Sequence, residues 1–119
     1  METRASGDRI PAEAVRLLEA LLSSDEPSHR ALLAQIPFLH VIGRCSCSCA
    51  SLVFDLDRSL VAAAPVSGTP MADATVVDAD GEPVGGALVF AHDGYLSSLE
   101  VYAWGDDQIR RLPAPDRLR

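Results

Sequence analysis

Residues 75–104 read TVVDADGEPVGGALVFAHDGYLSSLEVYAW, and this stretch decides the fold. It contains three runs rich in valine, leucine and aromatic residues, separated by Asp-Gly dipeptides at 80–81 and 93–94. Asp-Gly between alternating apolar runs is the strongest short-range signal for a β-hairpin. We therefore expect three antiparallel strands, a meander, with tight turns at the two dipeptides.

A two-residue turn at Asp93-Gly94 also predicts which side chains share a face of the sheet. The first face carries the pairs Phe90 with Ser97, Leu88 with Leu99, Gly86 with Val101 and Val84 with Ala103. The second face carries Ala91 with Leu96, Val89 with Ser98, Ala87 with Glu100 and Gly85 with Tyr102. Because the first face is almost wholly apolar, we expect helices to cover it. On the second face, the Tyr102 ring is expected to lie over Gly85.

The second face is less polar than a bare solvent-facing surface. Its expected members are Val76, Val89, Leu96, Tyr102 and Trp104, beside Asp78 and Glu100. One interpretation is that a loop over residues 62–72 folds across this face. The other is that a partner protein or a second copy of the chain, in a homodimer, docks there. In that case the binding residues are Glu100, Tyr102, Trp104, Asp78 and Leu96.

The first half of the chain predicts two helices followed by further strands. Residues 10–22 place Val15, Leu18 and Leu22 on one stripe, and residues 28–35 form a shorter helix with Pro27 in its first turn. Residues 51–57 alternate cleanly, which is typical of a half-buried strand. We expect residues 1–9 to be a flexible leader and residues 62–72, rich in Pro and Gly, to be a mobile loop. The predicted fold is α+β: one domain over 1–119, with two N-terminal helices packed on a four- to five-stranded antiparallel sheet that has the C-terminal meander at its centre.

Composition excludes several classes of function. All ten basic residues are Arg, so a Schiff-base lysine and a Gly-Lys phosphate loop are impossible. The formal net charge is −7, and no Arg lies between Arg58 and Arg110, so nucleic-acid binding is disfavoured and a cationic protein partner is favoured. The other interpretation is that these acids form an ordinary solvated surface. No apolar run reaches the roughly 18 residues that span a bilayer, and the N-terminus lacks a signal-like apolar segment, so we expect a cytoplasmic protein without membrane contact.

Three cysteines, Cys45, Cys47 and Cys49, are the clearest candidates for chemistry. Thiolates bind zinc or Cu(I), and His29, His40 or His92 would have to supply a fourth ligand. In an extended strand, side chains two residues apart lie about 6.6 Å from each other, too far for a single zinc ion. The cysteines are also small apolar side chains suited to packing on a sheet. Burial in the core and a thiol-based metal or redox-sensing module therefore stay open as alternatives, and no cofactor is assigned.

No residue is assigned a catalytic role. His92 and Asp93 precede Ser97 and Ser98, but Asp93-Gly94 already serves a turn and no nucleophile-elbow sequence is present. The acids of residues 78–82 lack the length and distal glutamate of a calcium loop, so turn formation explains them better. His29 is interpreted as a surface residue of the second helix.

The segments GRCSCSC (43–49), DGYLSSLEVYAWGDD (93–107) and RRLPAPDRLR (110–119) resemble a group of small bacterial proteins of unknown function. These proteins share a cysteine-rich stretch, a DGYLSSLEVY-type hairpin and an LPxPD-type tail. The resemblance covers about the last two-thirds of the chain, and it implies an architecture and a bacterial source without an activity. Small acidic domains of this shape are also similar to immunity or antitoxin proteins, which block a toxin by binding it. We therefore expect a non-enzymatic protein-interaction domain.

Overall fold

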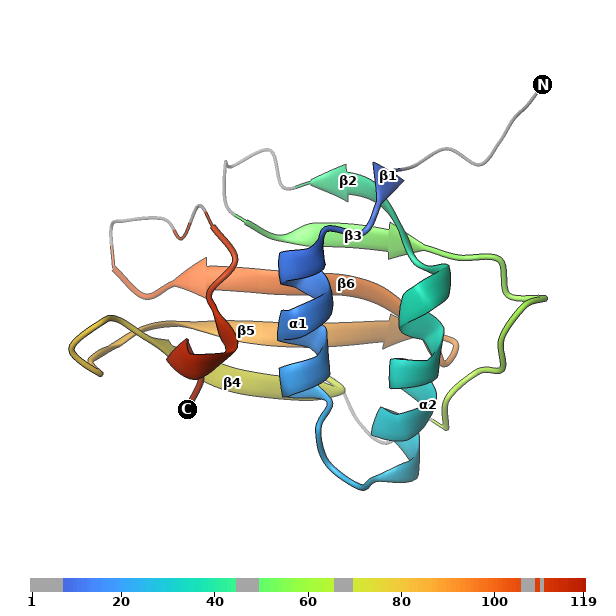
Figure 1. The fold of residues 1–119 in the computed structure, drawn as a ribbon, viewed down its shortest axis with the longest axis horizontal. Coiled ribbons are helices and arrows are strands. Elements are labelled where there is room, and N and C mark those ends of the chain that lie inside the picture. Colours follow the sequence, from blue (N-terminus) through green and yellow to red (C-terminus); the bar gives the residue numbers. More distant parts are fainter. Residues whose placement is uncertain (1–7, 45–49, 66–69, 106–108, 110) are drawn as a thin grey trace.

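The computed structural model describes residues 8–44, 50–65, 70–105, 109 and 111–119. Within this part of the chain the strands form one antiparallel sheet in the order β1-β2-β3-β6-β5-β4, accompanied by two α-helices (Figure 1). The elements are β1 (Asp8–Arg9), α1 (Ala12–Leu21), α2 (Pro27–Gln35), β2 (His40–Arg44), β3 (Leu52–Asp55), β4 (Ala72–Val77), β5 (Pro83–His92) and β6 (Tyr95–Ala103), with 3-10 turns at Ile36–Phe38 and Pro115–Arg117. The α+β class is as predicted.

The sheet is larger than the predicted four or five strands. Asp8 and Arg9, expected in a flexible leader, pair with Val41 and His40 and add a short sixth strand. The meander β4-β5-β6 forms as expected, but its last strand, β6, lies beside β3 and β4 is left at the sheet edge. The connection from β3 to β4 therefore returns across the width of the meander, which is a Greek-key arrangement.

Both helices lie on the same face of the sheet, and the C-terminal segment crosses that face beside α1 (Figure 1). The α1 residues Ala14, Leu17, Leu18 and Leu21 are buried, at the three- and four-residue spacing of an amphipathic helix. Leu18 and Leu22 of the predicted stripe are fully buried, whereas Val15 is only partly so. The core thus lies between the helices and one side of the sheet.

The turn between β5 and β6 has the predicted two-residue form. Asp93 and Gly94 have φ of 54° and 85°, as a type I′ turn requires, and His92 pairs with Tyr95. Ala91 then pairs with Leu96, but Phe90 pairs with Ser98, so Ser97 is an extra residue in a β-bulge.

Beyond this bulge the predicted register is wrong by one residue. The observed pairs are Val89 with Leu99, Ala87 with Val101, Gly86 with Tyr102 and Gly85 with Ala103. The physical reason is burial: without the extra residue, Leu96 and Leu99 would face opposite sides of the sheet. With it, Leu96, Leu99 and Val101 are all buried against the helix layer.

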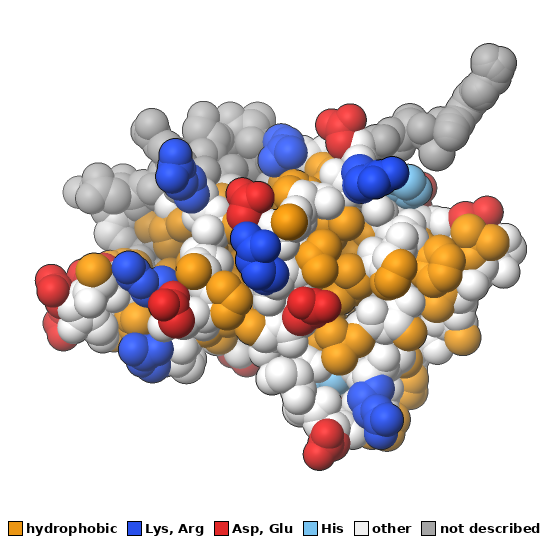
Figure 2. Space-filling view, viewed as in Figure 1, with side chains coloured by type: hydrophobic (Ala, Val, Ile, Leu, Met, Phe, Trp, Pro, Cys, Tyr) orange, Lys and Arg blue, Asp and Glu red, His pale blue; other side chains and the backbone are white. Residues whose placement is uncertain are grey.

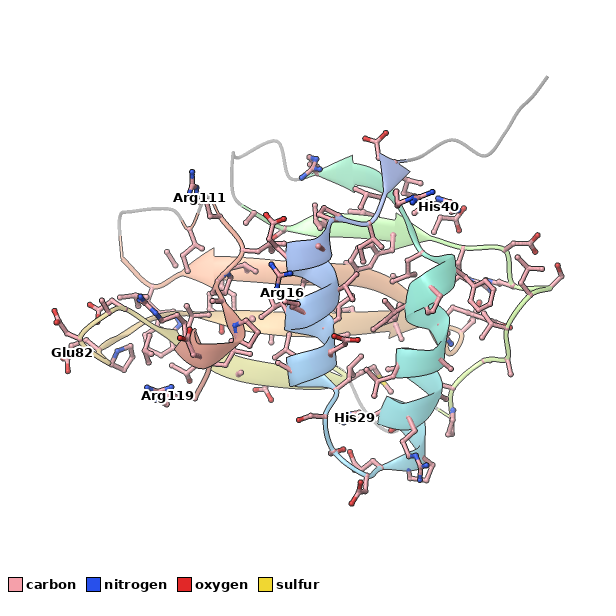
Figure 3. All side chains as sticks on the ribbon, in the orientation of Figure 1. Arg16, His29, His40, Glu82, Arg111 and Arg119 are labelled. Carbon is pink, nitrogen blue, oxygen red and sulfur yellow. The ribbon has the colours of Figure 1, made fainter. Side chains whose placement is uncertain are left out.

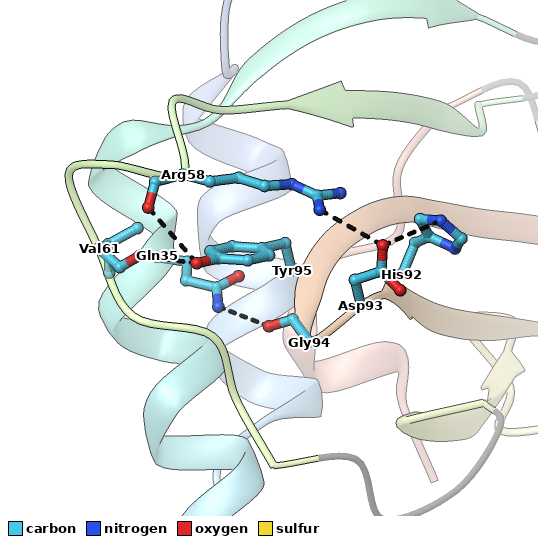
Figure 4. Close-up of polar contacts among 7 residues, drawn as sticks. All are labelled: Gln35, Arg58, Val61, His92, Asp93, Gly94 and Tyr95. Carbon is cyan, nitrogen blue, oxygen red and sulfur yellow. Dashed lines mark hydrogen bonds and ion pairs between the residues drawn. The ribbon is translucent and has the colours of Figure 1, made fainter.

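The segment between β3 and β4 includes the loop predicted for 62–72, and both described ends of this loop are hydrogen-bonded to the meander. Ala64 is buried, and its N–H donates to the carbonyl of Gly94 at 2.7 Å. At the other end Met71 is buried and donates to the carbonyl of Val89. Earlier in the segment the Tyr95 hydroxyl donates to the carbonyl of Val61 at 3.2 Å (Figure 4).

Candidate functional site

The side of the sheet turned away from the helices is the candidate site, and we call it the open face. Strand alternation and the observed register place on it Val53, Asp55, Asp73, Thr75, Gly86, Leu88, Phe90, Ser98, Glu100, Tyr102 and Trp104. The described segments outside the sheet lie on the helix side or beyond the strand ends, including the described parts of the loop proposed to cover this face (Figure 1). Among described residues, the open face is thus uncovered by the chain itself.

The open face combines apolar and acidic side chains. Leu88, in the central part of β5, pairs with Glu100 on one side and with Asp73 on the other, which gives an acid-leucine-acid row. In the neighbouring row Ser98 lies between Phe90 and Val53, and Val53 is 44% exposed. The residues that β3, β4, β5 and β6 place on this face include no Arg. At the β1 edge of the sheet, Arg9 pairs with His40, which pairs with Asp55, so Arg9 lies on the same side.

Tyr102 lies across a glycine, as predicted, but the glycine is Gly86 and not Gly85. A Cβ at Gly86 would collide with the outer end of the Tyr102 ring. Gly85 faces the helix layer, where a Cβ would collide with the carbonyl of Tyr102 and lie 2.9 Å from Cδ1 of Ile109. The missing side chain at Gly86 lets the ring lie flat on the sheet.

Aromatic surface is exposed at this end of β6. Tyr102 is 42% exposed and Trp104 is 58% exposed. The N–H of Trp104 donates to the carbonyl of Val84 at 3.0 Å, so strand pairing continues to this residue and alternation puts it on the same side as Tyr102. Exposed aromatic side chains of this kind are enriched in protein interfaces.

Three of the five predicted binding residues share the open face, and two do not. Glu100 and Tyr102 follow one another on the same side of β6, and Trp104 continues the alternation just beyond the end of the strand. Leu96 is 2% exposed and belongs to the core, because the bulge at Ser97 turns it to the helix side.

Asp78 is the second predicted binding residue that the open face does not use. It lies in the turn between β4 and β5, where its Oδ1 accepts from the N–H groups of Asp80 and Glu82. This turn has a three-residue loop closed by Asp78 and Glu82, with Gly81 at φ 85°, so it differs from the two-residue turn expected at Asp80-Gly81. The prediction that these acids serve a turn is consistent with these hydrogen bonds.

Val76 and Val89, also expected on the second face, are buried in the core. Leu88 takes the place that the predicted register gave to Val89. The open face is therefore still partly apolar, although its apolar members differ from the predicted ones.

A fully buried glutamine holds the turn beside the open face, and sequence reasoning missed it. Gln35 Nε2 donates to the carbonyl of Gly94 (Figure 4) and to that of Ala62, and its Oε1 accepts from the N–H of Leu96. Gln35 lies three residues after Leu32 on the buried side of α2. That spacing on the apolar stripe was the available signal.

His29 is buried, so its assignment to the surface was wrong. Its Nε2 lies 2.7 Å from the carbonyl of Met71 and therefore carries the proton, which leaves Nδ1 to accept from the Ser24 hydroxyl at 2.6 Å. Ser24 Oγ also accepts from the N–H of Glu26. These contacts join the α1–α2 loop to the start of β4.

The cysteines Cys45, Cys47 and Cys49 lie outside the described residues. Of the histidines named as a fourth ligand, His40 begins β2 and His92 ends β5 beside the β5–β6 turn. Both ring nitrogens of His29 are already hydrogen-bonded, to Ser24 and to Met71. In the ranges that the structure describes, no group of three His, Cys, Asp or Glu side chains is placed to hold a metal. The metal or redox module stays a prediction.

Several basic side chains are exposed on the helix side. Figure 2 shows them over α1 and the C-terminal segment, where Figure 3 places Arg16, Arg111 and Arg119. A polar cavity of about 600 Å³ on this side is lined by Pro11, Glu13, Arg44, Ala50, Leu52, Arg111 and Leu112. Figure 2 also shows acidic side chains among these arginines, and Glu13 and Glu19 of α1 are exposed, so the helix side carries both signs of charge.

Comparison with family models, with curated proteins and with solved structures found no match for the chain. Among the described residues, none of the helices combines the length and apolar character that crossing a membrane requires. The function is therefore inferred from the residues of the open face.

Proposed function

We propose that the protein is a non-enzymatic protein-interaction domain that binds a cationic partner protein through its open face. One observation carries this proposal: a sheet face left uncovered by the described chain presents leucine, phenylalanine and exposed aromatic side chains among carboxylates. Burial of such apolar and aromatic surface supplies binding free energy, and complementary charge guides the encounter.

The charge of the open face favours a different protein over a second copy of the chain. A two-fold homodimer brings the same patch of both subunits together. Glu100 and Asp73 of one copy would then come close to acids of the other, because the described Arg of this side, Arg9, lies at the opposite edge of the sheet. Like charges held together in an interface are unfavourable, whereas lysines and arginines of a partner would be attracted.

Immunity and antitoxin proteins are the functional class that this mode of action fits best. They are small binding domains that act by covering a toxin, and an acidic, partly apolar surface suits a basic toxin. This assignment is by analogy of shape and charge. A toxin gene next to the gene for this chain would support it.

Affinity capture from the native host tests the proposal with two charge-reversed variants. Glu100→Arg alters the open face, and Glu19→Arg makes the same change on exposed α1. We expect wild-type protein and Glu19→Arg to retain the same basic protein, and Glu100→Arg to lose it. Capture of no protein, or equal capture by both variants, would contradict the proposal, as would a stable homodimer that persists in the Glu100→Arg variant.

A further inference from the structure

We infer that Glu100, Tyr102 and Trp104 form a subsite for a cationic side chain, with arginine preferred over lysine. The inference rests on the proposed function and specifies what the open face recognises. Glu100 and Tyr102 occupy consecutive outward positions of β6, and Trp104 continues the alternation just after the strand ends, each about 7 Å from the next. One carboxylate and two aromatic rings are thus aligned on one edge of the open face.

The Tyr102 ring is a supported platform in this row. Its outer end packs on Gly86 of the neighbouring strand, while 42% of the residue stays exposed. One ring face is therefore held against the backbone and the other is available to solvent. A guanidinium group stacks on such a ring through cation–π and planar contact, which the compact ammonium of lysine does less well.

Glu100 supplies the negative charge beside this platform. It forms no ion pair with a described residue, and its one described polar contact is with the Ser98 hydroxyl, 3.5 Å from Oε2. The cross-strand neighbour of Glu100 is Leu88, followed by Asp73. A bound guanidinium could therefore contact a carboxylate and an aromatic ring at once, with a second acid two strands away to attract it.

The chain itself offers a reporter at this subsite. Trp104 is the single tryptophan of the sequence, so its fluorescence and its indole N–H resonance are assigned without ambiguity. An acetylated tetra-arginine peptide is a suitable probe, and tetra-citrulline is its neutral counterpart of nearly equal shape. Both peptides are titrated against the full chain at low and at moderate salt.

The expected result is a saturable change in both Trp104 signals with tetra-arginine, weaker at higher salt, and no change with tetra-citrulline. Tetra-lysine should bind less tightly than tetra-arginine. Glu100→Gln and Tyr102→Leu should each weaken binding about two- to fivefold, the size of an exposed ion pair or cation–π contact. Glu19→Gln on α1 should leave the affinity unchanged. All three substitutions are at exposed positions, so an unchanged circular dichroism spectrum checks the fold.

Equal responses to arginine and citrulline peptides, silent Trp104 signals, or equal losses in Glu100→Gln and Glu19→Gln would overturn the subsite. These outcomes differ from failure of the proposed function. If tetra-arginine binds as expected but host proteins are not captured, the subsite stands and the proposed function falls. If capture depends on Glu100 but tetra-arginine does not bind, the proposed function stands and the subsite falls.

Discussion

The side chain of Gln35 accepts a hydrogen bond from the backbone N–H of Leu96 at 2.9 Å. Gln35 ends α2, and Leu96 is the residue before the bulge in β6. The same carboxamide donates to the carbonyl of Gly94 at 2.8 Å. A single fully buried polar side chain therefore fixes the turn after which β6 changes register, and this register decides which residues reach the open face.

Replacing Gln35 with methionine tests this relationship. The change keeps the approximate volume but leaves the buried N–H of Leu96 without its acceptor. The carbonyl of Gly94 keeps a second donor, the N–H of Ala64. We expect a loss of about 1–3 kcal/mol in the free energy of unfolding, the cost of one buried unsatisfied group. Urea denaturation measures it, and a loss below about 0.5 kcal/mol would show that Gln35 does not hold the turn.

Two turn glycines provide a second test. Gly94 and Gly81 both have φ of 85°, but a Cβ at Gly94 would lie 2.6 Å from the carbonyl oxygen of Ala64, whereas a Cβ at Gly81 meets open space. Gly81→Ala should therefore lower the free energy of unfolding by only about 1–2 kcal/mol, the cost of a left-handed backbone at a residue with a Cβ. Gly94→Ala should lose about 1–3 kcal/mol more, because the loop must move. Equal losses in thermal or urea unfolding would contradict the close packing of loop and turn.

Gly85 and Gly86 are adjacent in β5 and lie on opposite sides of the sheet, so a substitution at each tests one side. Gly85→Ala places a Cβ against the backbone of Tyr102, so the strand itself must shift; we expect a loss of about 2–3 kcal/mol. Gly86→Ala meets only the outer end of the Tyr102 ring, which can swing away, so the loss should be smaller. Gly86→Ala should also weaken tetra-arginine binding, because the displaced Tyr102 ring would no longer lie flat on the sheet. A larger loss of stability for Gly86→Ala than for Gly85→Ala would indicate the register predicted from the sequence, in which Gly85 pairs with Tyr102.

Asp57 gives a prediction about pH. The hydroxyl of Ser59 at 2.6 Å, followed by its backbone N–H, donates to Asp57 Oδ1, and both lower the pKa of this exposed carboxyl. A lowered pKa in the folded state means that the interaction stabilises the fold above the ordinary carboxyl pKa. This stabilisation is lost as the pH falls through the folded-state pKa. NMR titration should show a higher pKa of Asp57 in Ser59→Ala and little change in Ser59→Thr; an unchanged pKa in Ser59→Ala would contradict the assignment.

Much of the fold could be predicted from local patterns. The Asp93-Gly94 turn, the Pro27 start of α2 and the alternation of Leu52, Phe54 and Leu56 each depend on residues close in sequence. The structure confirms these features because turn chemistry and periodicity act locally.

The one-residue offset could not be predicted in the same way. It depends on the burial of Leu96 and Leu99 on the same side of the sheet, which follows only when the helices, distant in sequence, pack on that side. The pairing of Asp8 and Arg9 with β2 also joins distant segments. Glu100, Tyr102 and Trp104 were placed together correctly because alternation along β6 and the residue after it keeps them on one side in either register. Leu96 was misplaced because it precedes the bulge.

Site-specific photo-crosslinking in the native host addresses binding at the open face most directly. A photoreactive amino acid at Leu88, in the middle of the acid-leucine-acid row, is compared with one at Glu19 on α1. We expect the Leu88 position to form a covalent adduct with a basic protein, and Glu100→Arg in the same chain to abolish that adduct. An adduct that forms equally from Glu19, or a Leu88 position that crosslinks only to its own chain, would contradict a partner-binding open face.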